Sequence, residues 1–213
     1  STFSGVFSND STDTSTAARN LSVTNTGSGG SVTLTGVNTY TGTTTVDSGA
    51  VLALGGAGSI ATSSEVVANG TFDIASTNSG ASVKSLSGSG SVITASSKGL
   101  DLTAAAGNFA GVISGAGGVV VSGGTETLSG VNTYTGSTSI SNGSTLALSG
   151  SGSVATSSGV VVNGTLDISN TASVASITTL SGNGSVVTAS GKSLTLTNAA
   201  DTFNGVVSGS GRL

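Results

Sequence analysis

The sequence predicts an all-β fold, a parallel β-helix (solenoid) with about three strands per coil. Residues 34–119 align without a gap on residues 128–213, at an offset of 128 − 34 = 94 residues, and about 50 of the 86 aligned positions are identical. Short apolar pairs alternate with clusters of Gly, Ser, Asn and Asp, mostly with a spacing of two residues and without helical periodicity. A long repeat of short strands and tight turns is typical of a stacked solenoid.

Two alternatives to the β-helix, a disordered chain and a β-sandwich, fit the sequence less well. Only 7% of the 213 residues are charged and 35 are Gly, which would also suit a disordered chain. Disordered segments are poor in β-branched residues, however, and this chain is rich in Val, Ile and Thr, which favour strands. A β-sandwich would explain the strands but not an ungapped repeat. The absence of Pro fits strands that are hydrogen-bonded on both edges.

The strands expected in the first full copy are short and evenly spread. Twelve strands in 94 residues suggest four coils of 23–24 residues, and about nine coils in all would stack at about 4.8 Å into a rod of about 43 Å. Conservative exchanges between the copies, such as Phe72 to Leu166, predict fixed inward positions. Asn69-Gly70 and Asn163-Gly164 are expected to round corners with positive φ. The expected strands centre on residues 32–34, 44–46, 52–54, 60, 66–67, 72–74, 83–86, 92–93, 100–102, 109–112, 119–121 and 127–128.

The whole chain, 1–213, is expected to form one β-helical segment. It divides into a partial repeat at 1–33, a full repeat at 34–127 and a truncated repeat at 128–213. The partial repeat has a polar insertion at 8–20 that lacks core residues and holds Asp10, Asp13 and Arg19. In a solenoid such an insertion projects as a loop, so these three residues are the best candidates for a specific contact. Both ends appear cut, which suggests an uncapped fragment of a longer array.

The segment "LTGVNTYTGTTTVDSGAVLALGGAGSI" at 34–60 and its copy at 128–154 resemble the autotransporter-associated β-strand repeat of Gram-negative passenger domains. The resemblance implies a right-handed parallel β-helix on the extracellular side of the outer membrane. It also implies a C-terminal β-barrel translocator in the parent chain. The sequence itself shows neither a signal peptide nor an apolar run long enough for a transmembrane helix, so no membrane insertion by this segment is expected.

Catalysis is not expected. Without His or Cys, these residues cannot form a Ser-His-Asp triad, a thiol nucleophile or a His-ligated zinc site. A β-helical polysaccharide lyase or hydrolase would need clustered carboxylates, whereas the nine acidic residues are scattered. Asp73 and Asp167 are one repeat apart, which four coils would make about 19 Å. Each acidic residue is expected to serve a turn or to face solvent.

The other candidate contacts have plainer alternatives. Tyr40 and Tyr134 could stack on a sugar or a partner, but we favour a packed ring with its hydroxyl in water. Asp10 and Asp13 could bind Ca²⁺, yet "GGAGSI" at 55–60 lacks the Asp of the calcium repeat, so no metal or cofactor is expected. A net charge of −4 with five basic residues argues against nucleic acid. Ser137 and Ser139 interrupt the Thr ranks that an ice-binding face would need.

The sequence therefore predicts a structural and adhesive surface module. Long uncharged faces of Ser, Thr and Asn would make many weak contacts with a host-cell or abiotic surface, or with neighbouring copies of the chain. The alternative is a passive spacer that presents an enzymatic or toxin domain located elsewhere in the full-length protein.

Overall fold

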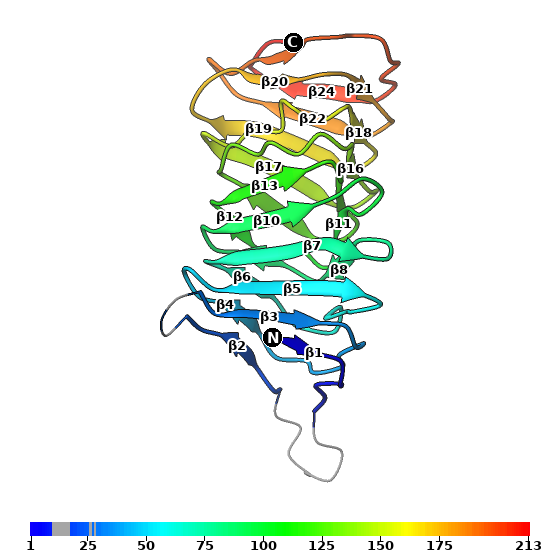
Figure 1. Cartoon of the computed structure of the whole chain (residues 1–213). Coiled ribbons are helices and arrows are strands. Elements are labelled where there is room, and N and C mark those ends of the chain that lie inside the picture. The colour runs from blue at the N-terminus through cyan, green and yellow to red at the C-terminus, as the bar shows by residue number, and fades with distance from the viewer. Residues whose placement is uncertain (10–17, 26, 28) are drawn as a thin grey trace.

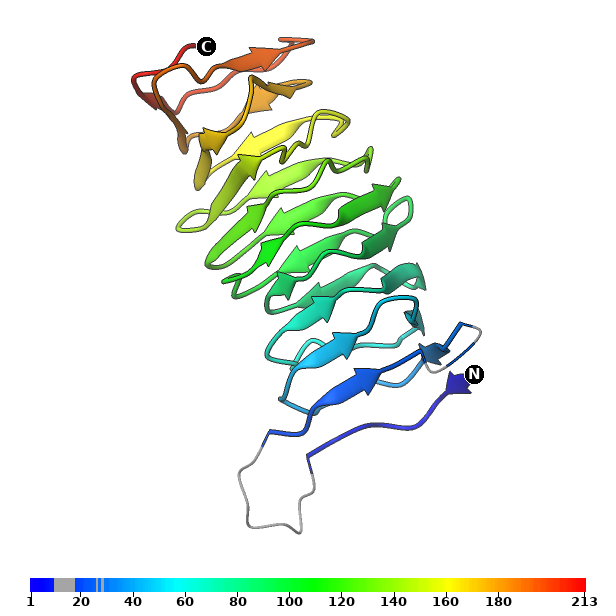
Figure 2. The same cartoon turned by 90° about the vertical axis from the view of Figure 1, so that its left-hand side faces the viewer.

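A computed structural model confirms the parallel β-helix. The structure describes residues 1–9, 18–25, 27 and 29–213. These residues form 24 strands and no helix, every pairing between strands is parallel, and the coils stack in about nine turns into a rod with the two termini at opposite ends (Figure 1, Figure 2). The described part of the chain has no helix with the length and hydropathy to cross a membrane.

The rod has three faces, which we number 1 to 3. Face 1 is turned toward the viewer in Figure 1. It consists of β1 (Thr2–Phe3), β3 (Ser31–Leu34), β5 (Val51–Gly56), β7 (Thr71–Thr77), β10 (Ser91–Thr94) and β13 (Val112–Gly115), then segments 131–135 and 151–155, then β20 (Ala175–Ile177) and β23 (Leu194–Leu196).

Face 2 consists of β2 (Leu21–Val23), β4 (Thr44–Val46), β6 (Val66–Ala68), β9 (Leu86–Ser87), β12 (Asn108–Phe109), β15 (Thr125–Leu128), β17 (Thr145–Gly150), β19 (Thr165–Thr171), β22 (Ser185–Thr188) and β24 (Val206–Gly209). Face 3 consists of segments 37–41 and 57–61, then β8 (Ala81–Val83), β11 (Leu100–Leu102), β14 (Val119–Val121), β16 (Thr138–Ile140), β18 (Val160–Val162) and β21 (Leu180–Ser181).

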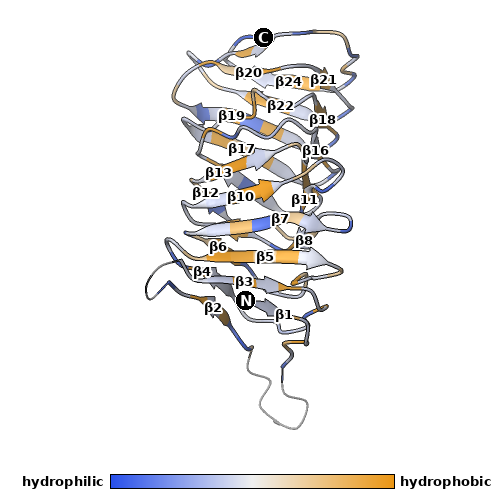
Figure 3. Cartoon of the chain, in the orientation of Figure 1, coloured by the Kyte–Doolittle hydropathy of each residue, from blue (hydrophilic) through white to orange (hydrophobic). Residues whose placement is uncertain are grey.

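The core is a set of apolar ladders inside the rod. Alternate residues of each strand point inward, and on face 1 the ladder runs through Leu52, Phe72 and Val92 in register. Hydrophobic residues accordingly recur from strand to strand along the rod (Figure 3). The inward positions predicted from the exchanges between copies are confirmed, because Phe72 and its counterpart Leu166 are both fully buried.

The predicted coil length is wrong. Paired residues of neighbouring coils are mostly 20 or 21 positions apart, as in Thr71 with Ser91 and Ser91 with Val112, rather than 23–24. We call each strand or face segment one side of a coil, so that three sides make one coil. Between β3 and its counterpart β15 lie eleven strands (β4–β14) and two face-3 segments, so β15 is the fourteenth side after β3. Fourteen sides are four complete coils and two further sides, which matches 94 residues at about 20 per coil.

Consequently, the two copies do not present equivalent residues on the same face. Strands β3, β5, β7 and β10 lie on face 1, whereas their counterparts β15, β17, β19 and β22 lie on face 2. An exposed surface of the first copy therefore recurs in the second copy on a different face of the triangular rod. It is displaced by about 22 Å along the rod axis, at about 4.8 Å per coil.

The corner glycines also differ from the prediction. Gly70 and Gly164 are not among the residues with positive φ. They are required for space instead, because a Cβ at Gly164 would collide with the carbonyl oxygens of Ser141 and Ser144 in the coil below.

Candidate interaction surface

Four exposed residues that are identical in the two copies and lie side by side form what we call the outer patch. In the first copy it consists of Val37, Thr39 and Thr41, with Ala61 of the next coil beside them; all four are exposed. The parallel bridge between Val37 and Ser59 sets this register. The second copy repeats all four identities and exposures, as Val131, Thr133, Thr135 and Ala155.

Buried hydrogen bonds explain why the residues between them are also identical. Asn132 is 2% exposed; its Oδ1 accepts from the amide of Ile113, and its Nδ2 donates to the carbonyls of Gly130 and Ser153. Asn38 makes the equivalent bonds with Phe7, Gly36 and Ser59 in the first copy. Each Asn thus joins three consecutive coils at a corner.

Tyr40 and Tyr134 lie inside the rod. They are 2% and 0% exposed, so neither ring can stack on a ligand without leaving the core. The prediction of ring packing is correct, but the prediction of a wet hydroxyl is wrong. The Tyr134 hydroxyl lies 2.6 Å from Thr138 Oγ1, and Thr138 Oγ1 donates to Ser157 Oγ at 2.9 Å. Burial raises the pKa of both tyrosine hydroxyls, and the hydrogen bond to the adjacent Thr partly opposes this shift.

No such internal contact requires Val37, Thr39 or Ala61 to be identical in the second copy. The structure gives Val37, Thr39 and Ala61 no side-chain hydrogen bond, and Val37 and Val131 are 55% and 54% exposed. Some other exposed positions have diverged between the copies, as in Ser48/Asn142, Ala57/Ser151, Asn78/Ala172 and Ser89/Asn183, whereas Thr62/Thr156, Ser64/Ser158, Asn69/Asn163 and Ser79/Ser173 are identical and exposed in both. Identity that packing does not demand makes the outer patch a candidate for contact with a partner, and Val37 and Val131 give each copy an exposed apolar side chain there.

The inserted segment begins and ends beside the first outer patch. Asn9 accepts from the amide of Thr41 and donates to its hydroxyl, and Asn20 accepts from the amide of Thr43. Arg19 is exposed, and its carbonyl accepts from the amide of Gly42. Asp10 and Asp13, the other two candidates, lie outside the described residues.

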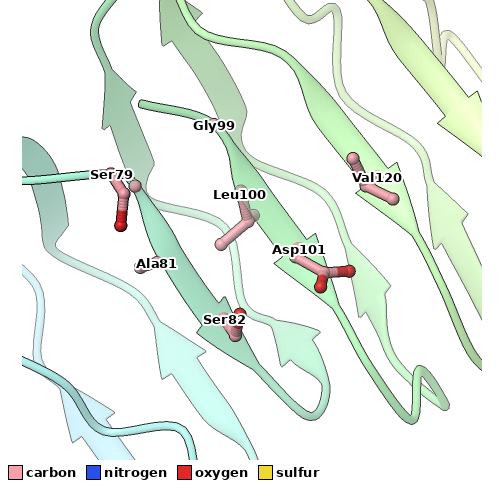
Figure 4. A pocket seen from close by; sticks show the side chains of 8 residues that line it. Ser79, Ala81, Ser82, Gly99, Leu100, Asp101 and Val120 are labelled. Carbon is pink, nitrogen blue, oxygen red and sulfur yellow. The ribbon is translucent and has the colours of Figure 1, made fainter. Parts of the chain in front are cut away.

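Most acidic residues whose carboxylate has a hydrogen bond in the structure stabilise the backbone or a side chain close by, as predicted. Asp73 Oδ1 and Asp167 Oδ1 each accept from the amide two residues later. Asp101 accepts from the Ser122 hydroxyl and is the only charged residue lining a shallow hollow of about 330 Å³ on face 3, formed by Ser79–Ser82, Gly99–Asp101 and Val120 (Figure 4). Among the described residues, no group of three or more His, Cys, Asp or Glu side chains could hold a metal ion.

Glu126 is the exception, and the prediction that it serves a turn or faces solvent is wrong. It is 0% exposed and occupies an inward position of β15. Burial raises its pKa to about 8. The signal was present in the sequence: extending the alignment of the copies by two residues places Glu126 on Val32, an apolar ladder position.

Comparison with known proteins adds no identification. No family model matches the sequence, and searches of curated proteins and of solved structures gave no significant match.

Proposed function

We propose that this chain is a structural and adhesive surface module, and that its outer patches make the contacts. The carrying observation is the identity of the exposed residues Val37, Thr39, Thr41 and Ala61 with their counterparts 94 residues later. The resemblance of 34–60 and 128–154 to autotransporter repeats supports a place on the extracellular side of the outer membrane of a Gram-negative bacterium, with a C-terminal β-barrel translocator in the parent chain.

The chemistry of the patch limits its partners. It carries no charge, so a nucleic acid or another strongly charged surface would gain little from it. One β-branched apolar side chain flanked by threonines suits a partner with an uncharged polar surface, such as a host-cell or abiotic surface or another copy of this chain. Each patch alone would be weak, and affinity would come from several patches acting together.

The arrangement of the patches modifies the mechanism expected from the sequence. The first patch lies on face 3 and the second on face 1, so the two cannot lie flat on one surface together. One rod would instead contact two partners in different directions. This geometry favours cross-linking of neighbours over avid attachment to a single plane.

The test is the settling and surface adherence of bacteria that display the chain. The quadruple variant Val37→Lys, Thr39→Lys, Val131→Lys and Thr133→Lys places charges on both patches. We expect it to lose at least about tenfold in settling rate or attached cells, because multivalent binding amplifies the loss of each weak contact. The matched control carries four lysines at diverged exposed positions: Ser48→Lys, Ala57→Lys, Asn142→Lys and Ser151→Lys.

A further variant separates the inserted segment from the patches. Replacing residues 10–17 by a Gly/Ser linker of equal length keeps the anchors Asn9 and Asn20 and removes Asp10 and Asp13. If this variant loses adherence while the patch variant keeps it, the inserted segment is the contact and the patch proposal fails. If the folded chain confers no adherence at all, it acts as a passive spacer for a domain elsewhere.

A further inference from the structure

The chain contains five Asn-Gly steps, the dipeptide in which a backbone amide most readily attacks the side chain before it. Gly has no Cβ, so nothing on that residue shields its amide nitrogen from the carbonyl carbon of the Asn side chain. The attack closes a five-membered ring and releases ammonia, provided that the peptide between the two residues can rotate. The fold therefore decides which steps react. The five steps begin at Asn69, Asn142, Asn163, Asn183 and Asn204.

The second of these steps, Asn142-Gly143, lies in the tight turn that leads from β16 on face 3 to β17 on face 2. The amide of Ser144 donates to the carbonyl of Ser141 at 3.0 Å, so Asn142 and Gly143 are the two central residues of a β-turn. Gly143 has a φ of 78°, which the second central residue of a type II turn requires. Both central residues are exposed.

Nothing in the described part of the rod holds the peptide between Asn142 and Gly143. Neither the amide of Gly143 nor the side chain of Asn142 has a hydrogen-bond partner there, and the carbonyl of Asn142 accepts no backbone hydrogen bond. A Cβ at Gly143 would meet no atom within 4 Å, so the space around the turn is open. This peptide can therefore rotate without breaking a hydrogen bond, and the amide nitrogen can reach the side chain by local motion alone.

The other four steps are held by the coil below. Three of their glycines donate their amides to carbonyls of that coil at 2.8–3.0 Å: Gly70, Gly164 and Gly184. At the fourth step, the amides of Asn204 and Val206, on either side of the Gly205 amide, both donate to the coil below at 2.9 Å. All four glycines are buried or half-buried, whereas Gly143 is exposed. Reaction at these four steps requires hydrogen bonds to open first.

The first copy has the same turn without the Asn. There the amide of Ala50 donates to the carbonyl of Asp47 at 2.9 Å, and Gly49 has a φ of 77°. Ser48 stands at the position of Asn142, and its side chain has no carbonyl carbon for the next amide to attack. The reactive turn therefore belongs to the second copy.

We propose that Asn142 is a deamidation site, at which the folded chain forms aspartate and isoaspartate with water as the only co-reactant. The amide nitrogen of Gly143 gives its proton to a base and bonds to Cγ of Asn142, the Cγ–Nδ2 bond breaks, and ammonia leaves with a proton. Water then opens the succinimide ring. Cleavage between the nitrogen and Cγ gives aspartate, and cleavage between the nitrogen and the α-carbonyl carbon gives isoaspartate. Asn and water thus become a carboxyl group and ammonia, with no change of oxidation state.

Both products alter this corner, and the inference is independent of the adhesive function proposed above. Each adds a negative charge to a chain whose formal net charge is −4. Isoaspartate also lengthens the backbone of the turn by one carbon. The carbonyl of Ser144 accepts from the amide of Thr165 in the next coil at 2.8 Å, so a longer turn displaces a contact between coils. Asn142→Asp has the charge without the extra carbon, and the purified isoaspartate form should melt below it.

The test is incubation of the whole folded chain at mildly alkaline pH, with fragmentation mass spectrometry to locate each new carboxyl group. We expect Asn142 to react at least about fivefold faster than any other Asn-Gly step, because each hydrogen bond that must open lowers the reactive population by roughly that factor. In urea the five steps should react at similar rates, since the fold no longer distinguishes them. Reaction spread evenly over the five steps of the folded chain, or fastest at another step, would overturn the proposal.

Exchanging one residue between the copies gives matched variants. Asn142→Ser takes the residue of the first copy and should abolish the fast reaction. Ser48→Asn should create a second fast step, because its turn has the same hydrogen bond and the same positive φ at Gly49. An isoaspartate methyltransferase, which methylates isoaspartate but not aspartate, should label the wild type and Ser48→Asn and leave Asn142→Ser nearly unlabelled. A folded Ser48→Asn variant without reaction at residue 48 would show that the turn does not determine the reactivity.

Discussion

At the scale of single residues, the interior of this β-helix depends on polar side chains that satisfy one another. Tyr134, Thr138 and Ser157 form a buried chain of hydroxyls that ends on the carbonyl of Gly136, and Tyr40 begins the same arrangement in the first copy. Because every member has a partner, the network positions the corner below the outer patch without the cost of an unsatisfied group.

Removing one hydroxyl from this network should have a modest and measurable cost. We expect Tyr134→Phe to lower the free energy of unfolding by about 1–2 kcal/mol, because Thr138 loses a buried partner. Tyr134→Ala should cost about 3–5 kcal/mol, since it also leaves a cavity. Urea denaturation checks both. Tyr40→Phe is the matched variant, and an unchanged stability in both Phe variants would contradict the network.

Replacing the buried Glu126 should have the opposite effect and raise the free energy of unfolding. Glu126→Val restores the residue type of the first copy, and we expect it to raise the free energy of unfolding at pH 7 by about 1–3 kcal/mol, because a buried polar group without a partner is replaced by an apolar one. Chemical denaturation measures the change. A destabilised Glu126→Val variant would show that Glu126 has a partner in the folded protein.

The sequence indicated only part of this residue-scale picture. Packing of the tyrosine rings follows from their place in a repeated corner motif. The hydroxyl network does not, because Tyr134 and Thr138 lie on opposite sides of a corner whose angle the sequence does not specify. The burial of Glu126 follows from its ladder position on β15 and not from its residue type, and only the alignment with Val32 indicates that position.

At the scale of the elements, each coil is short, and its corners press backbone against backbone. Gly70 and Gly164 are needed for this close approach and not for positive φ. The strand positions were largely predictable, because alternation of inward and outward residues is a local property. The corner contacts involve the coil below, about 20 residues away, and local patterns do not report them.

A methyl group at one of these corners should separate neighbouring coils. Gly164→Ala would press Cβ onto the carbonyls of Ser141 and Ser144, and we expect a loss of about 2 kcal/mol or more in stability. Gly55→Ala is the control, since a Cβ there would meet no atom nearer than Thr33 Cγ2 at 3.3 Å and its counterpart Ser149 already carries a side chain. Thermal unfolding distinguishes them, and equal melting temperatures would contradict the role assigned to the corner.

At the scale of the whole molecule, the repeat of the sequence and the repeat of the coil are out of step. A sequence repeat need not span a whole number of coils. A segment can form any of the three faces, provided that it has a suitable length and a suitable alternation of inward and outward residues. Fourteen sides per repeat therefore turn each copy by one face. The prediction of four whole coils per repeat is wrong because the repeat ends two sides into a fifth coil.

Distances between spin labels test this rotation, and the absence of cysteine makes single labelling sites straightforward. Labels at Thr39→Cys and Thr133→Cys lie on different faces. Labels at Ser82→Cys and Val161→Cys lie on face 3, four coils or about 19 Å apart. We expect the first pair to be clearly farther apart than the second, and similar distances would mean that the repeats are stacked on one face.

The central claim is that two outer patches, turned away from each other, let one rod join two partners. The most direct measurement compares clumping of displaying cells with their attachment when one patch or both are altered. We predict that Val131→Lys with Thr133→Lys abolishes clumping but leaves attachment through the first patch, and that altering both patches abolishes both. Clumping that survives the loss of both patches, with the chain folded and displayed, would contradict the account.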